Sequence, residues 1–95
     1  MFIPTTFTQK FELGKVLITP GARDDLELKD VISCLVRHAS GDFGDVSEED
    51  KAYNEEALED EGRIMSAYHD RNDVKFWIIT EWDRSATTIL LPSEY

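Results

Sequence analysis

Three strand-like runs in the last third of the chain constrain the fold more than any other feature. They span residues 63–68, 74–82 and 87–91. The connections between them are short and polar, and such connections favour β-hairpins. In the middle run, Phe76 and Ile78 point to one face while Trp77 and Ile79 point to the other, as expected of a central strand. The C-terminal third is therefore predicted to form an antiparallel meander.

Upstream of the meander, the pattern predicts one strand and one long helix. The strand is expected over Phe7–Thr19, with a bulge or bend at Gly14. The helix is expected to run to about Ala39, with Asp24 and Asp25 as candidate N-caps. Its apolar residues recur at helical spacing and form one stripe that should pack on the sheet. The stripe contains Leu28, Val31, Ile32, Leu35, Val36 and Ala39.

A second helix is predicted to begin at Ser47, in a pattern that resembles a capping box, and to end near Gly62. The element order is then β-α-α-β-β-β, an α+β fold with helices packed on the sheet. Ninety-five residues suit one domain, 1–95, whose ends at 1–6 and 92–95 we expect to fray. A chain this short buries only about 60–65% of its unfolded surface, so a homodimer or another partner would add stability.

The cellular compartment is predicted from the single cysteine and from the lack of a recognisable signal or membrane-spanning segment. Cys34 is the only cysteine, which excludes an internal disulfide and fits a reducing compartment. We interpret Cys34 as structural, on the polar edge of the first helix. The first residues lack a basic segment followed by a continuous apolar one, and no window is apolar enough to span a membrane. The sequence therefore predicts a cytoplasmic protein with no membrane association.

The negative charge of the chain is concentrated in one segment. Of a net charge of −10, the segment Asp42–Glu61 carries −9, from ten carboxylates and the single base Lys51. The remaining residues are nearly neutral. A field of this sign repels nucleic-acid phosphate, so direct DNA or RNA binding is not expected, and a basic protein is the favoured partner.

On the second helix, six carboxylates fall within an arc of roughly 140°. Tyr53, Ala57 and Leu58 are expected on the opposite side. Along the helix axis, neighbouring carboxylates in one row lie about 6 Å or 10 Å apart, comparable to the phosphate spacing of a nucleic-acid strand. A solvated face that keeps the protein soluble is the alternative interpretation. The predicted partner-binding residues are Glu48, Glu49, Glu55, Glu56, Glu59 and Asp60, with Asp42 and Asp45 from the preceding loop.

A polar turn and a histidine near an acid are further candidate sites. Trp82, Asp83 and Arg84 form a polar turn that is a second candidate partner-binding site, in which Arg84 could pair with an acid of its own hairpin. His38 and Asp42 could act as an acid–base pair, but they match no catalytic motif, and a role in satisfying the end of the first helix is favoured. No spacing of histidine, cysteine or acid matches a metal site, and no glycine loop matches a nucleotide site. We therefore predict no catalytic residue, metal or cofactor.

Two groups of residues carry a resemblance to a known family. The first comprises Arg37-His38-Ala39-Ser40-Gly41-Asp42-Phe43-Gly44-Asp45, Glu49-Asp50, Asn54, Ala57-Leu58, Arg63-Ile64 and Ser66-Ala67-Tyr68. The second comprises Phe76-Trp77-Ile78-Ile79-Thr80-Glu81, Asp83-Arg84-Ser85 and Thr87-Thr88-Ile89-Leu90-Leu91-Pro92. These residues resemble a family of small acidic proteins of plasmids, phages and integrated elements, in which Trp is expected where this chain has Phe43.

The resemblance implies a mobile-element setting. Some family members carry names that link them to type I restriction subunits, but this chain contains nothing like the methyltransferase motifs that those names imply. We therefore predict a non-enzymatic inhibitor whose acidic helix mimics nucleic acid and blocks the basic channel of a host defence protein, as anti-CRISPR and anti-restriction proteins do. The alternative is a small regulatory or accessory module that binds through the sheet and the 82–85 turn.

Overall fold

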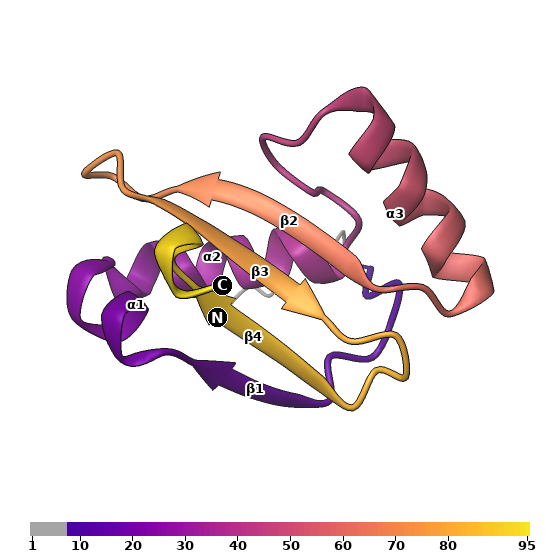
Figure 1. Ribbon diagram of the computed structural model, residues 1–95, viewed down its shortest axis with the longest axis horizontal. Helices are drawn as coiled ribbons and strands as arrows, with labels where there is room; N and C mark the ends of the chain where they lie inside the picture. Colours follow the sequence, from indigo (N-terminus) through magenta and orange to yellow (C-terminus); the bar gives the residue numbers. More distant parts are fainter. Residues whose placement is uncertain (1–7) are drawn as a thin grey trace, which may run out of the picture.

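The predicted meander is present and forms most of a four-stranded mixed sheet (Figure 1). The computed structural model describes residues 8–95. The strand order is β1-β4-β3-β2, with β1 parallel to β4 and the other pairs antiparallel. The α+β fold is thereby confirmed. In chain order the elements are β1 (Lys15–Ile18), α1 (Pro20–Asp25), α2 (Leu28–Ala39), α3 (Glu48–Asp60), β2 (Ile64–His69), β3 (Lys75–Thr80), β4 (Ala86–Leu90) and the 3-10 helix η1 (Pro92–Glu94).

The first strand is shorter than predicted. Of the expected range Phe7–Thr19, Phe7 lies outside the described residues, and only the four residues of β1 pair with another strand. Gly14 accounts for the difference, because its φ is +64° and a Cβ there would lie 2.4 Å from the carbonyl oxygen of Arg84. The chain therefore bends at Gly14, and Phe11 before the bend is buried in the core instead of pairing in the sheet.

The predicted first helix is present as α2, and a short helix that we did not predict, α1, precedes it. The hydroxyl of Thr19 caps α1 by accepting a backbone N–H of its first turn, and Pro20 follows at a position where no N–H is needed. The prediction of Asp24 and Asp25 as N-caps is wrong, because both residues lie at the C-terminal end of α1. A new helix, α2, begins at Leu28 and ends at the predicted residue.

The helix α2 is rotated relative to the predicted stripe. Leu28, Ile32 and Val36 were expected against the sheet, but all three are exposed. Cys34 and His38 are buried instead. Cys34 lies in the core and not at the polar edge predicted for it, and this burial raises the pKa of its thiol.

Contacts on the opposite flank of α2 account for this rotation. The carboxylate of Asp30 accepts hydrogen bonds from the backbone N–H, Nε and Nη2 of Arg71, in the β2–β3 turn, at 2.8, 3.0 and 2.9 Å. The guanidinium carbon of Arg37 lies 4.8 Å from the centre of the Tyr68 ring in β2. These contacts hold one flank of α2 toward β2. The exposed apolar flank consequently faces the other way, toward β1.

The core consists of two clusters. The larger lies between α1, α2 and the sheet face that they cover, and the smaller lies where α3 and the preceding loop meet β2. Buried members of the larger cluster are Ala22, Leu26, Val31, Cys34, Tyr68, Phe76, Ile78 and Ile89. The smaller cluster contains Phe11, Phe43, Ala57 and Ile64. The helix α3 therefore flanks the β2 side of the sheet, away from β1 (Figure 1).

The C-terminal residues pack against the domain, although we predicted that they fray. The helix η1 crosses the sheet face opposite α2 (Figure 1), and the Tyr95 ring meets Trp77 edge-on with 5.6 Å between ring centres. The carboxylate of Glu94 accepts the backbone N–H of Gly21 at 3.0 Å. The fraying predicted for residues 1–6 lies outside the described part of the chain. Within residues 8–95, no helix has the length and apolar character needed to cross a bilayer.

Candidate functional site

The predicted acidic helix is present as α3, with the expected boundaries. The hydroxyl of Ser47 accepts the backbone N–H of Asp50 at 3.1 Å, which confirms the predicted N-cap. Acids in the first turn suit the positive end of the helix dipole. The helix ends at Asp60, near Gly62 as predicted, and Glu61 after it adopts the left-handed conformation, with φ of +56°.

Two side chains anchor α3 to the rest of the domain. The amide of Asn54 pairs with the backbone of Met65 in β2, donating to its carbonyl at 2.8 Å and accepting its N–H at 3.1 Å. At the C-terminal end, the guanidinium of Arg84 donates to the carbonyl oxygens of Ala57 at 2.8 Å and Gly62 at 2.6 Å. Arg84 thereby places a positive charge at the negative end of a helix whose last turn carries no base.

Carboxylates on one face of α3 form a surface that we call the acidic strip. Its members are the six predicted residues Glu48, Glu49, Glu55, Glu56, Glu59 and Asp60, all exposed. No ion pair joins any of them to a base within residues 8–95, where the pairs are Arg23–Asp24, Arg37–Asp42 and Arg71–Asp30. The strip therefore keeps its full negative charge.

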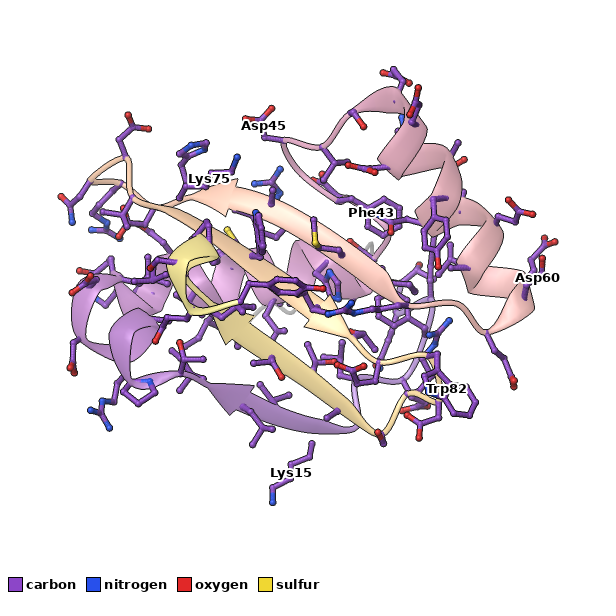
Figure 2. The ribbon with its side chains drawn as sticks, viewed as in Figure 1. Lys15, Phe43, Asp45, Asp60, Lys75 and Trp82 are labelled. Atoms are coloured by element: carbon purple, nitrogen blue, oxygen red, sulfur yellow. The ribbon has the colours of Figure 1, made fainter. Side chains whose placement is uncertain are left out.

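The two loop acids differ from one another. Asp45 is exposed and extends the anionic surface at the N-terminal side of α3 (Figure 2). Asp42 is bonded to Arg37 at 2.8 and 3.2 Å, and these hydrogen bonds hold the pKa of its carboxyl below the usual range. Asp42 is therefore paired with a base of its own chain, unlike Asp45 and the residues of the acidic strip, and its role in partner binding stays a prediction.

The uncharged side of α3 is narrower than predicted. Ala57 is buried and Leu58 partly buried, as expected, but the side chain of Tyr53 is exposed beside the strip. Asn54 takes the position against β2 that was assigned to Tyr53. The only sequence signal for this role is that Asn54 lies on the uncharged face, one turn before the small residue Ala57.

The three residues of the second predicted site, in the turn between β3 and β4, have different roles in the structure. Trp82 is 59% exposed and lies at the same end of the molecule as Asp60 (Figure 2). The carboxylate of Asp83 accepts the backbone N–H of Ser85 and fixes the turn. Arg84 binds backbone carbonyl oxygens and not the acids of its own hairpin, so our prediction of an ion pair there is wrong. Only Trp82 presents a free apolar surface.

The structure does not bring His38 and Asp42 together. The buried His38 ring is hydrogen-bonded through Nδ1 to Ser66 at 2.5 Å and through Nε2 to Thr80 at 2.9 Å, instead of satisfying the end of α2. Thr80 continues this chain to Thr87 of β4 at 2.7 Å. Burial lowers the pKa of His38 to about 3, so the ring is neutral and links three strands.

A metal centre has no support in the geometry either. Within the described residues, no three side chains of histidine, cysteine, aspartate or glutamate are grouped as ligands. What the site offers chemically is therefore fixed negative charge on an anchored helix, with an exposed Trp at one end. No family model, curated protein or solved structure matches this chain, so the family resemblance stays a prediction.

Proposed function

We propose that this chain is a non-enzymatic inhibitor that inserts the acidic strip of α3 into the basic nucleic-acid channel of a host defence protein. One observation carries the proposal: the strip is exposed, lies on one face of α3 and is unpaired with any base of the described chain. Charge that served only solubility could be distributed over the whole surface, whereas here nearly all the net charge lies in the segment 42–61. The resemblance to acidic proteins of mobile elements supports a defence complex as the target.

The spacing of the strip suits a site that normally holds phosphates. Glu55 and Glu59 lie one turn apart, about 6 Å along the axis, as do Glu56 and Asp60. In a nucleic-acid site, Lys and Arg side chains are spaced to contact consecutive phosphates, and carboxylates with a similar spacing can contact the same side chains. Because the interaction is electrostatic, association should be fast and should weaken steeply with added salt.

A matched pair of charge variants tests the proposal. The strip variant carries Glu55→Gln, Glu56→Gln and Glu59→Gln, and the control carries Glu12→Gln, Asp24→Asn and Asp25→Asn at exposed positions outside the strip. Both lose three negative charges. Plaque assays on hosts with a CRISPR or a restriction system should show at least about tenfold weaker protection of phage by the strip variant only. Equal protection by both variants would exclude the strip as the inhibitory surface.

Competition with DNA tests the proposed channel directly. The tagged protein is used to capture its partner from host lysate at low salt, and the captured complex is then washed with double-stranded DNA. A partner held in a nucleic-acid channel is released by DNA, because both ligands need the same bases. A partner that DNA does not displace binds elsewhere, and that result contradicts nucleic-acid mimicry.

A regulatory or accessory module is the second candidate, and the exposure of Trp82 favours it. Trp is enriched at the energetic centres of protein interfaces. In this case Trp82→Ala should weaken capture of the partner by about tenfold or more, while the strip variant captures it normally. The reverse pattern would leave only the first candidate.

A further inference from the structure

Five exposed apolar side chains lie on β1 and on the flank of α2 turned away from β2. We call them the β1 edge patch: Val16, Ile18, Leu28, Ile32 and Val36, each between 37% and 63% exposed. The side chains of β1 belong to the same surface as those of α2, because Val16 and Ile18 pair with Thr87 and Ile89, and Ile89 lies in the core cluster beneath α1 and α2. Exposed apolar residues that cluster in this way commonly mark an interaction site.

Within residues 8–95, the backbone of β1 is also unpaired along its outer side. Lys15 donates its N–H to the carbonyl of Ser85, just before β4, and Thr19 donates its N–H to the carbonyl of Ile89 in β4, at 3.0 Å each. Alternate residues of a strand direct their backbone groups to opposite sides, so those of Val16 and Ile18 point away from the sheet. The sequence Lys15–Ile18 contains no proline, and its one charged residue, Lys15, stands at the first position of the strand and leaves Val16, Leu17 and Ile18 without the charge that usually protects an edge.

We propose that the β1 edge patch joins two copies of this chain in a symmetric dimer, with β1 antiparallel to β1 of the second copy. The twofold axis passes beside Leu17, so that Val16 lies opposite Ile18 of the second copy. Each of these residues then exchanges its N–H and C=O bonds with the other, as in a hydrogen-bonded antiparallel pair. The two four-stranded sheets become one continuous sheet with both α2 helices on the same face.

The size of the patch fits a second copy. From the exposed fractions, the five side chains present roughly 400 Å² of apolar surface, about half of the ~800 Å² that each partner contributes to a standard interface. The backbone edge and polar neighbours such as Lys15 and Lys29 supply the remainder. An apolar centre with a polar rim is the composition expected of a homodimer interface.

The distribution of charge favours this edge over every other surface for self-association. Two copies with a net charge of −10 each repel one another, and most of that charge lies on α3 at the opposite side of the sheet. Within β1 the only charged residue is Lys15. In the antiparallel register Lys15 lies opposite Thr19 of the second copy, so the two lysines are at opposite ends of the joined strands.

Sedimentation combined with amide hydrogen exchange tests the dimer on the full chain. The mass should rise from that of one chain to that of two as the concentration increases. At the same time the N–H groups of Val16 and Ile18 should become protected from exchange. A protein that stays monomeric up to about 1 mM, or a dimer without protection of these two amides, overturns the proposal and leaves the patch to another segment or a foreign strand.

Two patch variants and a control complete the test. Val16→Pro removes an N–H that makes no bond within the sheet, and it should weaken the dimer about tenfold to a hundredfold. Ile32→Glu, at a position 63% exposed in the monomer, should have a similar effect without relying on a change in β1. Trp82→Ala, at 59% exposure outside the patch, should leave the dimer unchanged. Dimers of unchanged affinity in both patch variants would contradict the assignment.

The dimer and the inhibitor function respond oppositely to salt, so each can fail alone. Added salt screens the repulsion between two anionic copies and should strengthen the dimer slightly. The same change should weaken binding of the acidic strip to a basic partner. A dimer that dissociates steeply as salt is added is held by charge, and the β1 edge proposal is then wrong whatever α3 binds.

Discussion

The two edges of the sheet differ in what lies beside them. Along β2, the N–H of Ala67 donates to the Phe43 carbonyl at 3.1 Å, its carbonyl accepts the Asp45 N–H at 2.7 Å, and Asn54 pairs with both backbone groups of Met65. Along the outer side of β1, no element of residues 8–95 makes a backbone bond. One edge is closed by the loop and helix that present the acidic strip, and the other is open.

This difference shows how a small domain can separate two surfaces. An uncovered strand edge invites another strand, and proteins usually cover or charge it. Here the same contact protects the edge of β2 and holds α3 in place, because the Asn54 side chain of α3 bonds the backbone of Met65 in β2. The apolar edge at β1 is consequently kept at the far side of the sheet from the strongly anionic surface. Predictions of stability follow from this contrast, since substitutions at the closed edge should cost far more than those at the open one.

The largest effect is expected from Gly44→Ala in the loop that covers β2. Gly44 has φ of +71°, and a Cβ there would lie 2.2 Å from the carbonyl oxygen of Ala67. Strain and this clash should lower the free energy of unfolding by roughly 3 kcal/mol, as measured by urea denaturation. Gly41→Ala is the matched control, because its φ is also positive but its Cβ would meet only the flexible side chain of Lys10. Equal losses for both would show that the approach to β2 is unimportant.

A smaller effect is expected from the buried histidine that links the strands between the two edges. The unfolded chain binds a proton on His38 with a pKa near 6.5, whereas burial lowers the folded pKa to about 3. Stability should therefore fall as the pH falls through this interval, by roughly 1.4 kcal/mol per pH unit. Urea denaturation at pH 6.5 and pH 5 should measure about 1.6 kcal/mol of this loss, because the unfolded histidine is already half protonated at pH 6.5.

The variant His38→Gln provides the control for the pH dependence. It has no proton to bind between pH 5 and pH 6.5, so its stability should be nearly constant there, whatever its absolute value. His69 is exposed and remains in both proteins. A slope that persists undiminished in the variant would assign the pH dependence to other groups.

The smallest changes in stability are expected from one substitution at each edge of the sheet, which compares the edges directly. Asn54→Ala leaves the N–H and C=O of Met65 without partners at a partly buried position, and should cost about 1.5 kcal/mol. At the open edge, Val16→Thr keeps the β-branched shape and removes no bond, and should change stability by less than about 0.5 kcal/mol at dilutions that favour the monomer. Thermal unfolding measures both changes. Comparable losses of stability in the two variants would mean that the bonds along β2 do not make that edge more important for stability than the edge at β1.

Local patterns in the sequence predicted the parts of the fold that depend on neighbouring residues. The meander follows from alternation and short turns, and α3 follows from Ser47 and the acids after it. The rotation of α2 was not predictable, because apolar spacing alone favours the Leu28–Val36 flank. The deciding contact joins Asp30 to Arg71, 41 residues away. No pattern within a single helix contains that information.

The acidic strip itself was predictable, since carboxylates at helical spacing can be placed on one face without knowledge of the rest of the chain. Its anchors were not. Asn54 and Arg84 act through backbone groups of distant segments, and any residue supplies a backbone group, so the sequence carries no mark of the contact. The same reasoning applies to the open β1 edge, which depended on finding β1 short, parallel and at the end of the sheet.

The anchoring of α3 has an entropic consequence. Ser47 fixes its beginning, Asn54 its middle and Arg84 its end, so folding of the domain has already removed most of the backbone freedom of the helix. An acidic segment without such anchors would lose that freedom only on meeting a partner, at a cost in affinity. Here the distances between the carboxylates are set in advance, so under the proposed function the binding of the acidic strip to its partner would require little further ordering.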